Sequence, residues 1–200
     1  MKIVKPSAKL LSITPHAEKL IEYCGRKAHK SEDKITQNSY ISFIQKLIAW
    51  GHESVLEHAS ATIEFICDRG ITHELVRHRL ASYTQESTRY VNYKEGITVI
   101  EPCFWKKEQL PIHYYEWECA IKNIENSYKT LMKIGATPQE ARSVLPNSLK
   151  TEIVVTANFR EWRHIIKLRT SSRAHPQIQE IMNIGKKILV KECPYVFGDL

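Results

Sequence analysis

The 200-residue sequence has no apolar run near the ~18 residues that a membrane-spanning helix needs, so an integral membrane protein is excluded. Its first segment carries Lys2, Lys5 and Lys9, and Pro6 and Ser7 interrupt the apolar residues there. A secretory signal needs an unbroken apolar stretch of roughly 7–15 residues, which is missing. Internal repeats and Gly/Ser-rich linkers are also lacking. We therefore expect one cytoplasmic domain over residues 1–200, with no membrane partner.

Cysteine is scarce, odd in number and never arranged as C-x-x-C, which excludes a disulfide framework and a zinc knuckle. The five thiols favour a reducing compartment. H-E-x-x-H is missing as well, because His52-Glu53 is followed by histidine only at His58, so no metal is expected. A metal hydrolase stays a minor alternative. The cysteines are Cys24, Cys67, Cys103, Cys119 and Cys193.

Positive charge is in excess, with 29 Lys and Arg against 22 Asp and Glu and a net charge of +7. This excess favours anionic partners, and by itself it does not distinguish nucleic acid from nucleotides or phosphorylated cofactors. A nucleic-acid-binding module is therefore a competing hypothesis. It lacks a recognisable binding motif, and the basic residues are spread over several segments, so no nucleic-acid partner is expected.

Hydrophobic periodicity predicts an α+β fold, a single domain with a central, mainly antiparallel sheet flanked by long helices. Pro15, Pro138 and Pro176 are placed to open helices, and Asn158 is a suitable N-cap. Expected strands cover 8–14, 61–68, 89–93, 97–100 and 149–157, expected helices cover 15–30, 38–50, 71–80, a segment through 121–131, 138–146 and one from 176, and 81–88 is expected to be a loop.

The densest polar segment runs from Arg77 to Tyr90. Arg77, Arg79 and Arg89 carry fork-shaped guanidinium donors suited to phosphate oxygens, and hydroxyl side chains lie between them. The alternative is a solvated basic helix end followed by a capping loop. Ser87 lacks a nearby activating base, so phosphate anchoring is favoured over nucleophilic catalysis.

This segment resembles the hallmark of the flavin-dependent thymidylate synthases, which is R-H-R, seven residues and then serine. Here the pattern is Arg77-His78-Arg79, then residues 80–86, then Ser87. The resemblance continues, in the family's order, through His52-Glu53-Ser54-x-x-Glu57-His58, Ala141-Arg142-Ser143-Val144-Leu145-Pro146, Asn158-Phe159-Arg160 and Leu168-Arg169. It spans roughly residues 52–177.

The resemblance implies methylation of dUMP to dTMP, with methylenetetrahydrofolate as carbon donor and FAD reduced by NADPH. It implies a homotetramer with active sites where subunits meet, and a mechanism without a cysteine nucleophile. Arg169 corresponds to the catalytic residue that ionises the uracil N3. The implied FAD contacts are Ser54, Arg77, His78, Arg79, Gln85, Asn158, Phe159, Arg160 and His164. The implied dUMP contacts are Glu74, Leu75, Val76, Arg77, Gln85, Glu86, Ser87, Thr88, Arg89, Arg142 and Arg169.

Two positions depart from the pattern of some family members. Glu74 stands where some have Gln, and His164 stands where some have Asn. Both residues keep hydrogen-bonding capacity, so the departures affect individual contacts rather than the expected activity.

Overall fold

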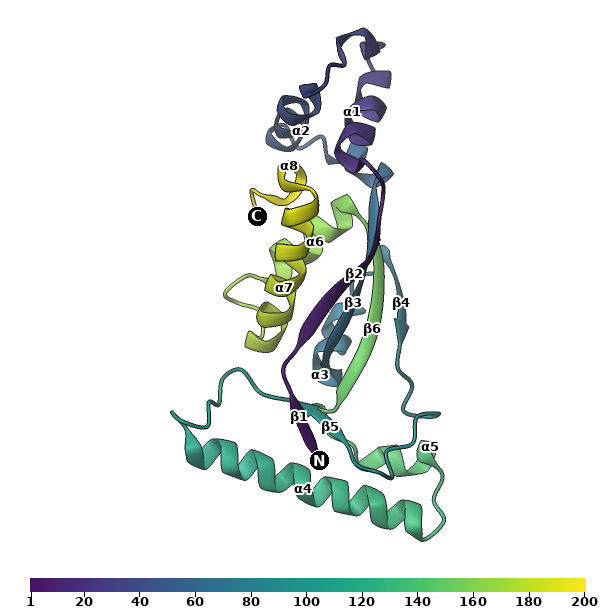
Figure 1. Cartoon of the computed structure of the whole chain (residues 1–200), viewed down its shortest axis with the longest axis vertical. Helices are drawn as coiled ribbons and strands as arrows, with labels where there is room; N and C mark the ends of the chain where they lie inside the picture. The colour runs from purple at the N-terminus through teal and green to yellow at the C-terminus, as the bar shows by residue number, and fades with distance from the viewer. The chain divides into compact units, whose positions relative to one another are not determined.

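The computed structural model describes all residues from Met1 to Leu200, and the elements are labelled in Figure 1. The strands are β1 (Lys2–Val4), β2 (Ser7–Ile13), β3 (Ser60–Asp68), β4 (Ala81–Gln85), β5 (Thr98–Ile100) and β6 (Lys150–Asn158). The helices are α1 (Ala17–Lys27), α2 (Ser39–Ala49), α3 (Arg69–Leu75), α4 (Pro111–Lys133), α5 (Pro138–Ala141), α6 (Phe159–Arg169), α7 (Pro176–Glu192) and α8 (Pro194–Phe197). Short 3-10 turns are η1 (Glu32–Lys34), η2 (Glu53–His58) and η3 (Arg142–Val144). No helix is long and apolar enough to cross a membrane.

The chain groups into two compact units. The first unit contains Met1–Ser7, Phe65–Arg77 and Thr84–Ile153. The second unit contains Ala8–Glu64, His78–Tyr83 and Val154–Leu200. Each unit draws on separate stretches of the sequence, and the chain passes from one to the other within β2, β3, β4 and β6 and in the turn between α3 and β4. A single folding domain therefore stays a prediction.

The four-stranded sheet has the order β2-β3-β6-β4. β3 and β6 are antiparallel, because the Phe159 N–H donates to the Ala59 carbonyl at one end and the Arg69 N–H donates to the Leu149 carbonyl at the other. β1 and β5 form a separate parallel pair, with Lys2 opposite Thr98. Long helices accompany the sheet, so the predicted α+β class with a mainly antiparallel sheet is confirmed.

The first unit is built around α4, the long teal helix of Figure 1, and the β1–β5 pair. Its apolar cluster contains Ile97 and Val99 next to Ile121 of α4 and Leu149, all nearly inaccessible to solvent. The predicted period through Ile121 and Tyr128 is confirmed, since both residues are buried on one side of α4.

The second unit is organised by α6, which follows β6 directly. Asn158 caps it as predicted, because its side-chain oxygen accepts from the Glu161 N–H at 2.9 Å. Trp162 and Ile165 are buried, and the Trp162 indole N–H donates to the Ala61 carbonyl at 3.0 Å. Burial of side chains this large stabilises the unit by about 1.5–3 kcal/mol each.

Several local predictions are wrong. The helix expected over 71–80 is α3, which ends at Leu75, and the loop expected over 81–88 begins with strand β4. β4 lies at the sheet edge, where only alternate side chains need burial, so its small polar residues resemble a loop. Residues 89–93 form turns rather than a strand, and helix α1 begins at Ala17 rather than Pro15. Strand β1 was not expected, since three residues carry too short a pattern.

Candidate active site

The R-H-R motif lies in the turn between α3 and β4, outside any helix. Arg77 and Arg79 are exposed, whereas His78 is only 5 % exposed. The helix predicted over 71–80 therefore does not reach this motif, and the turn leaves both arginines accessible to an anionic ligand. Leu75, at the end of α3, is fully buried, with neither its side chain nor its backbone exposed.

His78 joins two distant motifs inside the second unit. The Nε atom of Arg169, in the last turn of α6, donates to His78 Nε2 at 3.0 Å. Burial, together with the nearby Arg169 and His164, lowers the pKa of His78 to about 4. The imidazole is therefore neutral, and because Nε2 accepts a hydrogen bond, its proton is on Nδ1. That proton faces the Glu161 carboxylate, with 3.5 Å between Nδ1 and Oε1.

The surroundings of His78 hold it in place. The Tyr83 hydroxyl, in strand β4, donates to the His78 carbonyl at 2.7 Å. Burial raises the pKa of Tyr83 to about 12, so this hydroxyl keeps its proton. The His164 ring packs edge-on against His78, with 5.4 Å between ring centroids. These contacts fix both the ring and the backbone of His78.

A cavity of about 610 Å³ lies beside this cluster in the second unit. Arg160, His164 and Lys167 supply N–H donors to its wall. Arg160 also pairs with Glu57, at 2.7 Å between NH1 and Oε1, at an exposed position. The complete lining is Glu53, Glu57, Leu80, Asn158, Arg160, Glu161, Arg163, His164, Lys167 and Leu200. The wall therefore offers cationic groups among carboxylates.

Four predicted cofactor contacts of the second unit do not line this wall, namely Ser54, His78, Arg79 and Phe159. Ser54 is exposed within η2, between the lining residues Glu53 and Glu57. The Phe159 side chain is fully buried and packs edge-on against Phe197, with 5.0 Å between ring centroids. Phe159 therefore packs in the core of the second unit and has no exposed surface.

The ligand atoms of His78, Glu161 and His164 lie within 4.8 Å of one another, a set able to hold a metal ion. The guanidinium of Arg169 already donates to His78 there and would repel a second cation. The absence of a metal stays a prediction, now with this electrostatic argument.

The first unit carries the predicted phosphate-binding segment, which follows β4. Gln85 Nε2 donates to the hydroxyls of Thr72 at 3.0 Å and Thr151 at 3.3 Å. The Ser87 hydroxyl accepts from the Arg89 N–H at 3.3 Å. The Arg89 side chain is exposed, so its guanidinium can meet a phosphate without further rearrangement of the backbone.

The remaining predicted substrate contacts are also in the first unit. Arg142 is exposed at the start of η3, Val76 is exposed, Glu74 is half-buried, and Thr88 is buried. The prediction that Arg142 lies in a helix continuing to Pro146 is replaced by a short helix and a 3-10 turn. Arg169 is the one predicted substrate contact located in the second unit.

Sequence reasoning missed several residues that organise these clusters. Glu161 lies three residues before the predicted cofactor contact His164 on α6, and that i, i+3 spacing was the available signal for Glu161. Arg163 is 6 % exposed, and its two terminal nitrogens bind the Asp199 carboxylate at 2.6 and 2.7 Å. Nothing in the local sequence pattern predicts this long-range ion pair between Arg163 and Asp199.

Comparison with known proteins decides the family. A family model described as thymidylate synthase complementing protein matches residues 9–195. The flavin-dependent thymidylate synthase of Pyrococcus furiosus is 38% identical over 168 residues, covering 81% of this chain and 67% of that protein. The chain belongs to the flavin-dependent thymidylate synthase family. The relative from Geobacter sulfurreducens is 34% identical over 203 residues, covering 95% of this chain and 84% of that protein.

Solved structures agree with this family fold. A UMP/dUMP methylase, PolB of Streptomyces cacaoi bound with 5-Br dUMP, has a TM-score of 0.86 at 21% identity, over 99% of this chain and 96% of that one. Thymidylate synthase X from Helicobacter pylori, with FAD and dUMP, has a TM-score of 0.80 at 22% identity, over 97% and 98%. At these identities the likeness establishes the fold, and the flavin-dependent thymidylate synthase resemblance of the sequence is confirmed by the family match.

Proposed function

We propose that this protein methylates dUMP to dTMP, taking the carbon from methylenetetrahydrofolate and the hydride from FAD that NADPH reduces. Membership of the flavin-dependent thymidylate synthase family supports the reaction. The observation that carries it is the contact between Arg169 and His78, which joins two family motifs 91 residues apart. The folded chain thereby brings both motifs into one cluster.

The second unit has groups suited to FAD. A cavity of about 610 Å³ accommodates part of a dinucleotide, and Arg160, Lys167 and His164 line it with donors for phosphate oxygens. We propose that Asn158, Ser54 and Arg79, all in the second unit, contribute polar contacts there. The other two predicted FAD contacts, Arg77 and Gln85, belong to the first unit. Bound FAD would supply the hydride transfer, which protein side chains cannot perform.

The first unit has groups suited to the dUMP phosphate. We propose that Arg89 binds the phosphate as a charge-assisted partner, with Ser87 and Thr88 donating from hydroxyl and backbone groups. Arg142 is exposed and adds positive charge for the same anion. Gln85, held by Thr72 and Thr151, keeps the start of this segment fixed to the sheet.

Arg169 is the proposed catalytic residue. Arginine stays protonated, so it cannot remove the uracil N3 proton, and its contribution is electrostatic. A fixed positive charge beside N3 lowers the pKa of that proton and enriches the ring in electron density, which makes the ring a better nucleophile. The neutral His78, by accepting from Arg169 Nε, fixes the direction in which the guanidinium points.

A cysteine nucleophile is not needed in this scheme. Burial raises the pKa of Cys67 and of Cys193 to about 12, so neither supplies a thiolate near neutral pH. None of the five cysteines forms a disulfide bond, which supports a reducing, cytoplasmic location.

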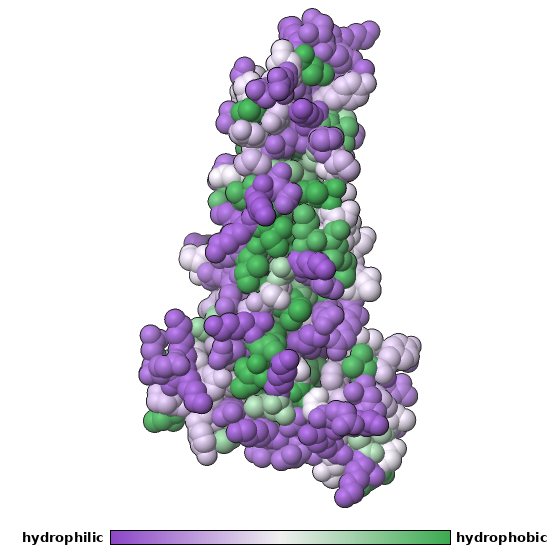
Figure 2. All heavy atoms as spheres, in the orientation of Figure 1, coloured by the Kyte–Doolittle hydropathy of each residue, from purple (hydrophilic) through white to green (hydrophobic).

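A homotetramer with shared sites is also part of the proposal. Figure 2 shows hydrophobic residues gathered at the surface on the face it presents. Large apolar side chains are exposed at Leu80 (75%), Tyr90 (78%) and Ile112 (74%), in or beside the candidate site segments and at the start of α4. Exposed apolar surface of this kind is typical of protein interfaces. Light scattering should report four subunits, and an active monomer would contradict this.

The absorption spectrum of the purified protein tests the cofactor assignment. We expect a yellow protein with a flavin band, whose bound cofactor is FAD after extraction. A colourless protein that gains no flavin when FAD is added, and that instead shifts DNA in a gel, would favour the nucleic-acid-binding alternative.

A further inference from the structure

Glu86 is the most completely held residue of the proposed phosphate-binding segment. Its backbone N–H donates to the Glu152 carbonyl at 2.9 Å, and its own carbonyl accepts from Arg69 NH1 at 3.1 Å. Its carboxylate accepts from the Tyr93 hydroxyl at 2.5 Å and from Lys150 Nζ at 3.2 Å. Every polar group of Glu86 is therefore engaged with another part of the first unit.

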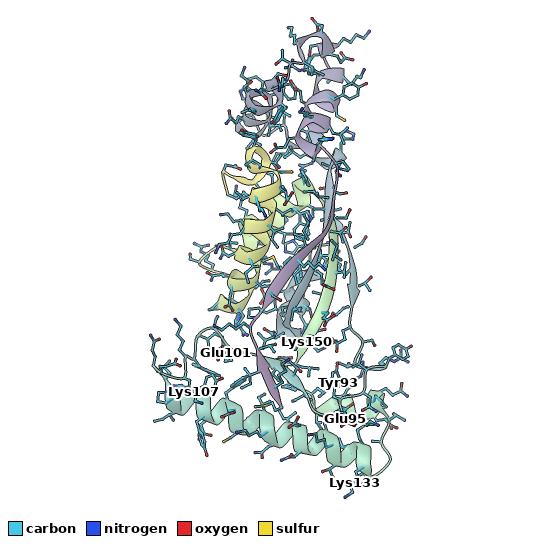
Figure 3. The ribbon with its side chains drawn as sticks, in the orientation of Figure 1. Tyr93, Glu95, Glu101, Lys107, Lys133 and Lys150 are labelled. Carbon is cyan, nitrogen blue, oxygen red and sulfur yellow. The ribbon has the colours of Figure 1, made fainter.

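The anchors of Glu86 come from separate elements. Lys150 begins β6, Arg69 begins α3, and Tyr93 follows the turn itself; Tyr93 and Lys150 are labelled in Figure 3. Tyr93 is anchored in turn by Tyr128 of α4, because the Tyr93 N–H donates to the Tyr128 hydroxyl at 3.3 Å and the rings meet edge-on. The contacts tie Glu86 to the rigid framework of the unit.

The turn that follows Glu86 is held in place by the contacts of Glu86 and by its own hydrogen bonds. The N–H groups of Tyr90 and Val91 both donate to the Ser87 carbonyl, at 3.1 and 3.0 Å, and the Ser87 hydroxyl accepts from the Arg89 N–H. Ser87 is bonded directly to Glu86, so the position of Glu86 determines where the turn and Arg89 begin. A phosphate site built on such a turn depends on this pre-organisation.

Glu86 also creates an electrostatic difficulty. Its negative charge is one residue from Ser87 and three from Arg89, in a segment proposed to bind a phosphate dianion. The Lys150 ammonium, 21% exposed, neutralises this charge and pairs with Glu152 as well. Burial alone would lower the pKa of Lys150, but the hydrogen bonds to Glu152 and Glu86 outweigh it and raise the pKa, so Lys150 is charged at neutral pH.

We propose that Lys150 and Tyr93 are positioning residues for dUMP binding, which hold the Glu86 carboxylate in place and, through Lys150, cancel its charge beneath the phosphate. The inference rests on the proposed function, because it takes dUMP as the ligand of this turn. Neither side chain needs to touch the nucleotide. Lys150 acts on the charge of Glu86, and Tyr93 acts on its position.

Calorimetric titration of the flavin-loaded protein with dUMP tests this. Lys150→Met should weaken dUMP binding about tenfold, because the Glu86 charge is then left uncompensated near the phosphate. Adding Glu86→Gln to Lys150→Met should recover most of the affinity, since the repulsive charge is gone. Lys122→Met is the matched control in the same unit, where Lys122 pairs with Glu118 at an exposed site, and it should bind dUMP like the parent protein.

Recovery of dUMP affinity in the double variant distinguishes charge compensation from a structural role, because Glu86→Gln removes a charge but cannot restore packing that is lost with the Lys150 side chain. Deoxyuridine, which lacks the phosphate, should bind the parent and Lys150→Met alike. Failure of the parent protein to bind dUMP would contradict the proposed function itself. Parent-like dUMP binding by Lys150→Met, or no recovery in the double variant, would overturn the inference while leaving the function intact.

Tyr93→Phe provides a second variant that does not depend on Lys150→Met folding. It keeps the ring on Tyr128 and removes only the hydrogen bond to Glu86. We expect dUMP binding to weaken about threefold to tenfold, because the lost hydrogen bond lies within the protein and only part of its free energy affects the bound nucleotide. Unchanged dUMP affinity in Tyr93→Phe would contradict the positioning role.

Discussion

Acidification should destabilise the fold through His78. Its pKa in the folded protein is about 4, against an ordinary value of 6.5, chiefly because the ring is buried and also because Arg169 and His164 are close. Between these two values, His78 is protonated in the unfolded chain and neutral in the native protein. The free energy of unfolding therefore falls as the pH is lowered through this window, and it is unaffected by His78 above about pH 7.

The size of the effect follows from the two pKa values. The interval from 6.5 to about 4 corresponds to at most about 3 kcal/mol once His78 is protonated in both states. At pH 5 the unfolded histidine is almost fully protonated and the folded one is almost neutral, which gives a loss of about 2 kcal/mol.

Urea denaturation at pH 7 and pH 5, at one protein concentration, measures this loss. His78→Gln removes the titrating group and offers a side-chain carbonyl to Arg169 in place of Nε2. His29→Gln, at an exposed position of the same unit, is the matched control. We expect the parent protein and His29→Gln to lose about 2 kcal/mol more than His78→Gln between pH 7 and pH 5. Equal losses in all three proteins would refute the reasoning.

Three further changes test other parts of the account. Arg89→Ala should weaken dUMP binding by about 1.5–3 kcal/mol, or one to two decades, with flavin retained, and calorimetry showing parent-like dUMP binding would remove its phosphate role. Arg169→Ala should keep its fold and flavin but lose dTMP formation, and Arg169→Lys should recover part of it; a near-parental rate in Arg169→Ala at saturating dUMP would end the catalytic assignment. Asp199→Ala should lower the free energy of unfolding by about 3 kcal/mol, and by more than Arg163→Met does, because it leaves the buried Arg163 cation without its main partner. Thermal unfolding that ranks the two variants in the opposite order would contradict this.

The elements that the sequence predicts well are those whose burial is decided locally. The alternation of Ala61, Ile63 and Phe65 marks β3, because every second side chain enters the core. Pro176 begins α7 as expected, since proline suits the first turn of a helix. β4 and β1 could not be found this way. Their pairing depends on β6 and β5, which lie far along the chain, and not on their own residues.

The candidate site likewise has some features that the sequence predicts and others that it does not. The R-H-R motif and Arg169 are recognisable as sequence, and the contact of Arg169 with His78 is consistent with that recognition. The neutral state of His78 could not be predicted, because it results from burial and from charges on α6. The link from Lys150 to Glu86 crosses 64 residues, so only the folded chain reveals it.

Formation of dTMP from dUMP tests the central claim most directly. The protein would be incubated with dUMP, methylenetetrahydrofolate, NADPH and FAD, and the nucleotides would be separated and identified by mass spectrometry. A parallel sample would use protein from which the flavin has been removed, with no FAD added. We expect dTMP in the complete mixture and none without flavin. Absence of dTMP from the complete mixture, or equal dTMP without flavin, would contradict the account.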